Sequence, residues 1–314
     1  MKIITFEQIK KLNLDSSVYY HWVEDVIAHK KEMMLPAKIS LKPDIPGVFY
    51  NTMPAAIPQI GVAGVKLVTR YPERLPSLDS EILLYDLSTG ENLALVDGNM
   101  ITAMRTGAVA AHSVKLFAKP GFSKIGIIGL GNVARATFLM LASVFPNKHF
   151  VVFLKKYKNQ HELFAERFHE LQNVEFRFCE QYEEIIENSE VVISAVTVFE
   201  NDICRDDYFH KGVLVVPIHT RGFTNCDLFF DKVFADDINH VRGFKNFERF
   251  ASFAEVSDVV TGIKPGRESD EERIIAYNIG IALHDLYFAG KLYELCSKDS
   301  LQIDLCAPKE KFWI

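Results

Sequence analysis

The chain has 314 residues, of which 48% are hydrophobic, and a formal net charge of −6 at pH 7. A chain of this length and composition can bury a large core, and we expect two domains. The negative charge provides no basic footprint, which argues against nucleic acid as a partner. No stretch approaches the roughly 20 uncharged apolar residues that cross a bilayer, which argues against a membrane protein.

The N-terminal segment and the cysteines predict a cytoplasmic protein. Residues 1–17, MKIITFEQIKKLNLDSS, lack the long apolar region of a secretory signal. The five cysteines are odd in number and never spaced CxxC. We therefore expect neither a metal site nor a disulfide, and interpret the cysteines as ordinary thiols in a reducing cytosol.

Residues 1–118 carry the pattern of a mixed α+β region. Helical spacing runs through FEQIKKL and SSVYYHWVEDVIAHKKEM. Strand-like runs follow in AKISLK, GVAGVKLVTRY and SEILLYDLSTGENLALVDG, and the turn Ser88–Glu91 makes the last of these a hairpin. An alanine-rich helix is predicted over 99–118, ended by Pro120 and Gly121.

From Lys124 the pattern changes to strands that alternate with helices. The strand-like runs are KIGIIG, HFVVFL, VEFRFC, VVISAV, GVLVVPIH and KVFADD. Apolar, β-branched strands separated by helices predict an α/β fold, a doubly wound parallel sheet covered on both faces. Residues 270–296, DEERIIAYNIGIALHDLYFAGKLYELC, are predicted to form one long helix with an apolar face.

The segment KIGIIGLGNVA, residues 124–134, is a strand, a glycine turn and the start of a helix. In this context Gly129 allows a tight turn, Gly131 allows a pyrophosphate to approach the backbone, and Ala134 allows close helix–strand packing. The phosphates then meet N–H groups at the helix N-terminus. The alternative is a tight turn of a doubly wound fold that binds nothing there.

The end of the next strand bears on the choice of dinucleotide. An acidic residue there would pair with the ribose 2′-hydroxyl of NAD, whereas basic residues suit the 2′-phosphate of NADP. The strand ends Leu154-Lys155-Lys156 without a carboxylate. Lys155 and Lys156 therefore favour NADP over NAD, unless they only form a solvated loop.

Several segments together resemble the ornithine cyclodeaminase/mu-crystallin family, which includes archaeal-type alanine dehydrogenase, ketimine reductases and a siderophore-precursor synthase. They are NTMPA (51–55), GVAGVKLV (61–68), the hairpin, the run from ITAMRTGA to GLGNVA, and VTGIKPGRESDEERIIAYNIGIALHD (260–285). The resemblance covers most of the chain in order. It implies a Rossmann domain over 119–285 and a discontinuous α+β substrate and dimerisation domain over 1–118 with 286–314. The active site of a homodimer subunit would then lie between the domains.

The resemblance also assigns substrate-binding roles. Arg105 matches an arginine that grips the substrate carboxylate, although an arginine in an alanine-rich helix is otherwise as often on the surface. Lys66 matches a family lysine near the substrate and is a candidate catalytic residue, because a lysine within a buried strand is costly unless it is paired or used. Desolvation would lower its pKa towards proton transfer. Lys38 matches a further basic contact, but its strand pattern equally allows an exposed side chain.

For the cofactor, Thr106 and Gly107 match positions close to the phosphates, and Asn132 and Val133 continue the glycine loop. Thr197 resembles the residue that lines the nicotinamide ribose. Gly280 lies where the family lets the nicotinamide end approach the backbone, or else serves only helix packing.

Two departures from the family pattern concern the substrate. Asn51 stands where relatives carry a group that varies with substrate, and an amide neither neutralises a carboxylate nor acts as a base. The family's catalytic aspartate would fall near HTRG (219–222), which has no carboxylate. His219 is a candidate proton acceptor there, or a structural or exposed histidine, and Arg221 is a candidate contact for an anionic substrate group.

The sequence thus predicts an NAD(P)-dependent enzyme that acts on the Cα–N bond of a small amino acid or its imine, with cyclodeamination as one outcome. The missing carboxylate favours an alternative, a mu-crystallin-like protein that binds NADP and a small ligand with little turnover. A third possibility is an enzyme that splits an opine-like adduct oxidatively, as in the siderophore-precursor branch.

Overall fold

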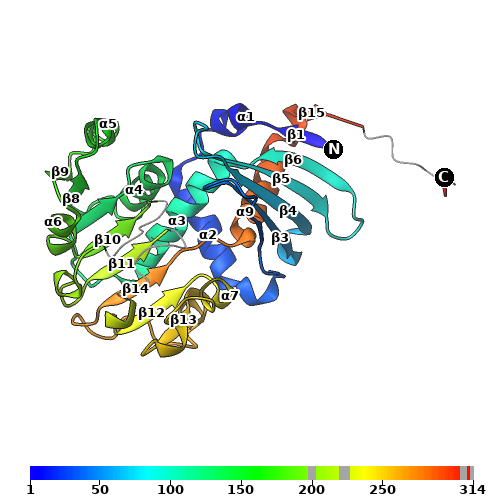
Figure 1. The fold of residues 1–314 in the computed structure, drawn as a ribbon. Coiled ribbons are helices and arrows are strands. Elements are labelled where there is room, and N and C mark those ends of the chain that lie inside the picture. The colour runs from blue at the N-terminus through cyan, green and yellow to red at the C-terminus, as the bar shows by residue number, and fades with distance from the viewer. Residues whose placement is uncertain (197–202, 219–226, 305–309, 312–314) are drawn as a thin grey trace. The chain divides into compact units, whose positions relative to one another are not determined.

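The computed structural model describes residues 1–196, 203–218, 227–304 and 310–311 (Figure 1). The chain divides into two compact units. The first comprises Met1–Asn13, Lys31–Thr102 and Ala282–Ile314, and the second comprises Leu14–Lys30 and Ala103–Ile281. Compared with the domain boundaries expected from the sequence, Leu14–Lys30 belongs to the second unit and one boundary falls within a helix, after Thr102.

The first unit is built on a seven-stranded sheet in the order β15-β1-β6-β5-β4-β3-β2. Its strands are β1 (Lys2–Ile4), β2 (Ile39–Leu41), β3 (Phe49–Ile57), β4 (Val62–Arg70), β5 (Leu78–Asp86), β6 (Asn92–Asp97) and β15 (Leu301–Gln302). Its helices are α1 (Phe6–Lys11) and α9 (Ala282–Cys296), with 3-10 turns η2 (Pro58–Ile60) and η6 (Ser297–Asp299). Strands β2 to β6 pair antiparallel with their neighbours, whereas β1 runs parallel to β6.

The predicted hairpin is confirmed as β5 and β6. The carboxylate of Asp86 accepts hydrogen bonds from the backbone N–H groups of Ser88 and Thr89, at 2.9 and 2.8 Å. Gly90 has a positive φ of 72°, which closes the turn. The pKa of Asp86 is lowered to about 2. The largest cause is a hydrogen bond from the Ser88 hydroxyl, and the bonds from Thr89 and from the Ser88 N–H add to it.

Helix α9 covers one face of the sheet, against β3, β4 and β5. A Cβ on Gly290 would lie 2.8 Å from the Ile60 side chain, so a glycine allows the helix to approach closely. The alternation of β4 places Lys66 and Val68 on the covered face and Leu67 on the opposite, exposed face. Lys66 is therefore a fully buried charged residue on the face of β4 that α9 covers.

The prediction of one helix over 270–296 was wrong. Residues Ile274–Tyr277 form strand β14, and α9 begins only at Ala282. β14 lies between β11 and β12 and is fully buried, so tertiary pairing overrides the helical spacing. Gly280, with a φ of 90°, lies between the two elements in a conformation that no α-helix contains.

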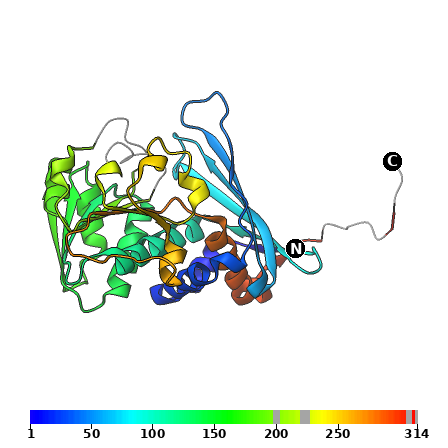
Figure 2. The same ribbon diagram turned by 90° about the horizontal axis from the view of Figure 1, so that it is seen from below.

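The second unit carries an eight-stranded parallel sheet in the order β13-β12-β14-β11-β10-β7-β8-β9 (Figure 1). Figure 2 shows the same ribbon turned by 90°. Its strands are β7 (Lys124–Ile128), β8 (Phe150–Lys155), β9 (Val174–Cys179), β10 (Val191–Ser194), β11 (Leu214–Pro217), β12 (Lys232–Ala235), β13 (Phe253–Glu255) and β14. Its helices are α2 (Ser16–Ala28), α4 (Asn132–Val144), α5 (Gln160–Arg167), α6 (Tyr182–Glu187), α7 (Ile238–Val241) and α8 (Val256–Val260), with 3-10 turns η3 (Asp206–Tyr208), η4 (Asp227–Phe229) and η5 (Phe247–Arg249). Helix α3 (Asn99–Phe117) and the turn η1 (Lys30–Glu32) continue across the boundary.

The central strands of this sheet are buried along their whole length. Every residue of β10, β11, β12 and β14 is buried, as expected for strands with helices on both faces. Helix α6 packs against β7, β8 and β9. The parallel sheet, together with the α+β arrangement of the first unit, confirms the predicted fold class.

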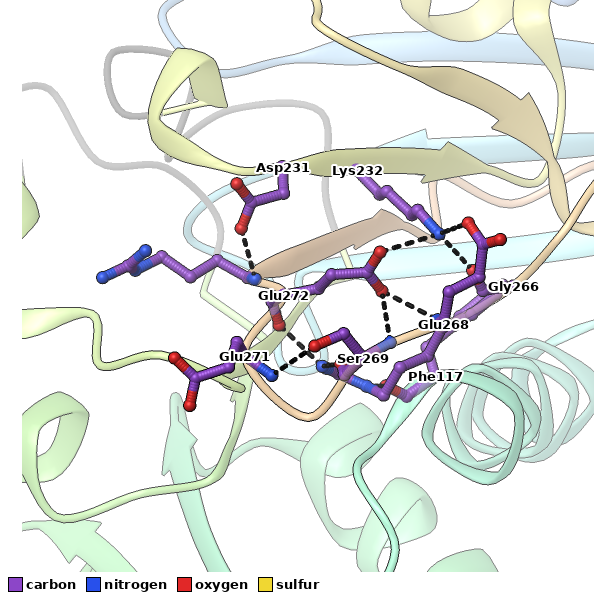
Figure 3. A network of polar contacts seen from close by, with 10 residues as sticks. Phe117, Asp231, Lys232, Gly266, Glu268, Ser269, Glu271 and Glu272 are labelled. Carbon is purple, nitrogen blue, oxygen red and sulfur yellow. Dashed lines mark hydrogen bonds and ion pairs between the residues drawn. The ribbon is translucent and has the colours of Figure 1, made fainter.

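Residues 266–272, GRESDEE, make a network of polar contacts at the amino-terminal edge of the parallel sheet (Figure 3). The ammonium group of Lys232, at the start of β12, lies 2.6 Å from Glu268 and 2.9 Å from Glu272. The Arg267 guanidinium donates to the carbonyls of Phe117 and Gly212, at 2.7 and 3.1 Å. Because ligands of open α/β sheets bind at the carboxyl ends of the strands, this segment has a structural role.

A buried histidine is expected to make the second unit less stable in acid. His112 lies on α3 with its Nδ1 atom 3.0 Å from the Tyr20 hydroxyl, and burial lowers its pKa from 6.5 to about 4. Because the folded pKa lies below the unfolded one, the stability is complete above about pH 6.5 and falls as the pH drops towards 4, by about 1.4 kcal/mol per unit. We expect the wild type to lose about 2–3 kcal/mol of unfolding free energy between about pH 7 and pH 4.5, measured by urea denaturation. His112→Gln should lack this loss, and an equal loss in both proteins would assign it to other groups.

Candidate functional site

The glycine turn lies at the point where the strand order of the parallel sheet reverses, between β7 and β10. Gly129 follows β7 with a φ of 86°. A Cβ at this position would lie 2.7 Å from the carbonyl carbon and oxygen of Ala195, which follows β10. The Ala195 N–H donates to the Ile128 carbonyl at 2.7 Å. The fold itself therefore requires glycine at position 129.

Gly131 has no such structural explanation. It is the N-cap residue of α4, and within the described part of the chain no side chain caps the helix and no atom lies within 4 Å of a Cβ built there. Gly131 and Asn132 are exposed, Val133 is half-buried and Ala134 is fully buried. The first turn of α4 thus presents backbone N–H groups on an open surface, which suits an anion that approaches the main chain closely.

Helix α3 crosses α4 immediately beyond this turn. A Cβ on Gly107 would lie 2.6 Å from the carbonyl carbon of Ala136, so the two helix backbones touch. Thr106 is 7% exposed beside this contact. The contact explains Gly107 by packing, and it places Thr106 beside the first turns of α4.

The two lysines at the end of β8 have an acidic neighbour that the sequence pattern did not reveal. The Lys156 ammonium lies 2.6 Å from the carboxylate of Glu180, and Lys155 donates to the Glu180 carbonyl at 2.6 Å. Glu180 follows β9, and β8 pairs in register with β9 up to Lys155 and Cys179. No motif links positions 24 or 25 residues apart, so only the strand pairing brings this acid to the lysines.

Arg135 is a further cation near the glycine loop, and no sequence pattern singled it out. It lies in the first turn of α4, and its Nη2 atom donates to Gln160, the first residue of α5, at 3.1 Å. Its Nε atom is buried and makes no hydrogen bond within the described part of the chain. The side chain therefore reaches from the glycine loop towards the segment that follows β8.

Arg105 is buried in the second unit, 7% exposed, which excludes the surface interpretation. A Cβ on Gly280 would lie 2.5 Å from its Nη1 atom, so the guanidinium lies against the Gly280 backbone. The Gly280 N–H donates to Asp236, a buried carboxylate just after β12, at 2.5 Å. Burial raises the pKa of Asp236, but His240 and this N–H outweigh it and leave the pKa below its usual value.

Lys66 is completely buried in the first unit, as is its partner Asp285 on α9. The Lys66 ammonium lies 2.6 Å from the Asp285 carboxylate and 2.6 Å from the Thr102 hydroxyl, which also lies 3.1 Å from Ser80. A carboxylate in direct contact stabilises the ammonium form. Asp285 stands 219 residues from Lys66 in the sequence, and nothing in its helical segment marked it as a partner.

A family model for the ornithine cyclodeaminase/mu-crystallin family matches residues 3–300. The chain belongs to this family.

Among its relatives, ketimine reductase mu-crystallin of Mus musculus is 28% identical over 261 residues, which cover 78% of this chain and 80% of that protein. The N-((2S)-2-amino-2-carboxyethyl)-L-glutamate dehydrogenase of Staphylococcus aureus is 28% identical over 236 residues, covering 70% and 69%. A solved archaeal alanine dehydrogenase, a dimer with bound NAD, superposes with a TM-score of 0.84 at 23% identity and covers 97% of this chain and 99% of that one. At that identity the likeness shows the fold alone.

Of the remaining residues that the family pattern singles out, two lie in the described part of the chain and three lie outside it. Asn51 shares the covered face of β3 with Met53, which pairs with Lys66, and its Oδ1 accepts from Ser40 at 2.6 Å. Lys38 is half-buried just before β2. Thr197, His219 and Arg221 lie outside the described residues.

Within the described residues no helix has the length and apolar character needed to cross a membrane.

Proposed function

We propose that this family member is an NAD(P)-dependent oxidoreductase that acts on the Cα–N bond of a small amino acid or its imine. The proposal rests above all on Gly131, an exposed glycine at the N-terminus of α4 that no packing contact within the described residues explains. When bound, the oxidised nicotinamide takes a hydride from Cα while the substrate nitrogen loses a proton, which yields an imine; the reverse direction reduces an imine. The relatives named above, a ketimine reductase and an N-substituted amino-acid dehydrogenase, support this chemistry.

Arg105 is proposed to bind the substrate carboxylate. A planar guanidinium donates two parallel hydrogen bonds to a carboxylate and so fixes the orientation of Cα. Its burial supports the assignment, because burial strengthens the interaction between opposite charges. Lys38, Asn51 and Arg221 remain proposed substrate contacts on the family pattern.

Lys66 remains a proposed catalytic residue, with a changed role. The contact with Asp285 favours a permanent cation rather than a neutral amine that accepts a proton. A fixed positive charge stabilises negative charge that develops on a substrate carbonyl or carboxylate. His219 is then the proposed proton acceptor, since imidazole titrates near neutrality.

The cofactor contacts are proposed at both ends of the dinucleotide. Gly129, Gly131, Asn132, Val133 and Thr106 are assigned to the pyrophosphate. Thr197 and Gly280 are assigned to the nicotinamide end.

A substrate panel tests the enzymatic function. The purified protein is incubated with NAD or NADP and amino acids, and with NADH or NADPH and cyclic imines or 2-oxo acids with amines. A change in the absorbance of the reduced nicotinamide identifies the substrate. Saturable dinucleotide binding without any turnover would instead support a ligand-binding protein, the alternative that the absence of a carboxylate from residues 219–222 favours.

We propose NADP as the preferred cofactor because the β8 terminus carries Lys155 and Lys156. Replacing both lysines with glutamate places two negative charges where the 2′-phosphate is expected. The affinity for NADPH should fall by roughly tenfold or more and that for NADH much less. Fluorescence titration with both dinucleotides measures the two affinities. Equal losses of affinity for NADPH and NADH would show that the lysines only form a solvated loop.

The solved archaeal alanine dehydrogenase is a dimer, and this chain is proposed to form a homodimer through its first unit. Apolar side chains on the uncovered face and edge of its sheet support this, since Ile39 and Leu41 are 59% and 61% exposed and Leu67 is 38% exposed. Sedimentation analysis of the purified protein tests it.

A cytoplasmic location is proposed as well, and the buried free thiols of Cys179 and Cys296 are consistent with a reducing compartment.

A further inference from the structure

The carboxyl ends of β8 and β9 form one continuous charged edge. The Lys156 N–H donates to the Cys179 carbonyl at 2.9 Å, which extends the pairing of the two strands by one residue. Glu180 therefore emerges directly beside Lys156. Its own N–H donates to the Glu184 carboxylate at 2.9 Å, which anchors the backbone at this position.

Both lysines are engaged by this one residue. The Lys156 ammonium contacts the Glu180 carboxylate, and Lys155 contacts the Glu180 carbonyl with its ammonium 5.0 Å from the centre of the Tyr182 ring. The hydrogen bond with Lys156 lowers the pKa of Glu180, and the same bond raises the pKa of Lys156. The charge on Lys156 is thus compensated within the protein.

This edge lies where a Rossmann fold holds the adenosine ribose. β8 is the strand next to β7, and in Rossmann folds residues at the carboxyl end of the equivalent strand contact the ribose 2′ position. Dinucleotide folds that select NAD place an acid at the end of this strand. In this chain the acid comes from the end of the neighbouring strand instead.

We propose that Glu180 sets the selectivity between NADP and NAD, because its carboxylate forms an ion pair with the Lys156 ammonium group that a 2′-phosphate would bind. This inference rests on the proposed function of the site. NADP binding requires the phosphate to displace the Glu180 carboxylate from Lys156, whereas NAD leaves this ion pair intact. Glu180 thereby lowers a preference for NADP that the lysines alone would make stronger.

The test is the variant Glu180→Gln, titrated with NADPH and with NADH. We expect the dissociation constant for NADPH to fall roughly three- to fivefold, the range of an exposed ion pair, while that for NADH changes less than about twofold. Glu175→Gln is the matched control, because Glu175 lies on β9, the strand that precedes Glu180, in an exposed ion pair with Arg177. It removes the same charge and should change neither constant.

A second variant isolates the ion pair. In a Lys156→Gln background, Glu180→Gln should bring no further gain in NADPH affinity. Equal changes for NADPH and NADH, a gain that persists without Lys156, or the same gain in Glu175→Gln would each overturn the inference. Wild-type protein that binds neither dinucleotide would instead overturn the proposed function, and the inference with it.

The fragments adenosine 2′,5′-bisphosphate and 5′-AMP separate the phosphate from the nicotinamide end. Glu180→Gln should strengthen binding of the bisphosphate only. Because exposed charges are screened, the gain should shrink as ionic strength rises. A gain for both fragments, or one that salt leaves unchanged, would contradict a role for charge at the 2′ position.

Discussion

Replacing Asp285 with asparagine is expected to lower the free energy of unfolding by about 3–5 kcal/mol. The Lys66 ammonium and the Asp285 carboxylate are both fully buried and 2.6 Å apart. Asparagine keeps the shape of the side chain but removes the charge that balances the ammonium. An uncompensated charge in a fully buried position is far more costly than the loss of an exposed pair.

Urea denaturation of a set of variants checks this result. Glu271→Gln is the matched control, because Glu271 forms an ion pair with Lys211 in which both side chains are about two-thirds exposed. Its loss should cost less than about 1 kcal/mol. The double variant Lys66→Met with Asp285→Leu should recover much of the stability, since it removes both charges. Additive losses from the two sites would show that the pair is not coupled.

Replacing Arg105 with lysine is expected to lower kcat/KM by roughly a hundredfold or more and to leave dinucleotide affinity unchanged. A lysine keeps the charge but cannot donate two parallel hydrogen bonds to a carboxylate. It also leaves unfilled the space against the Gly280 backbone that the guanidinium occupies. The measurement uses the substrate that the panel identifies, together with a titration of NADPH.

Arg177→Lys serves as the control for this substitution, because Arg177 is 56% exposed on β9. It should leave both turnover and dinucleotide binding at wild-type values. Unchanged turnover in Arg105→Lys would remove the carboxylate-binding role from Arg105. Loss of dinucleotide binding in the same variant would place Arg105 at the cofactor instead.

Local patterns in the sequence were sufficient for much of the fold. The Asp86–Gly90 turn, the alternating strands and helices after Lys124, and the glycine turn at 129–131 each depend on residues close together in the chain. Their backbone preferences, hydrophobic period and hydrogen bonds are set within a few residues. The family pattern also pointed to Arg105 and Lys66, both of which are buried.

Only the tertiary structure decided features that depend on distant residues. Ile274–Tyr277 has helical spacing but forms a central strand, because β11 and β12 provide its hydrogen-bond partners. Asp285 pairs with Lys66 and Glu180 pairs with Lys156 through sheet and helix packing that no short-range period encodes. Such contacts bear on the proposed roles of these residues, since Asp285 balances the charge of Lys66 and Glu180 balances that of Lys156. The charge state of a buried or clustered side chain is set by its neighbours in space, and the chain brings those neighbours together only when it folds.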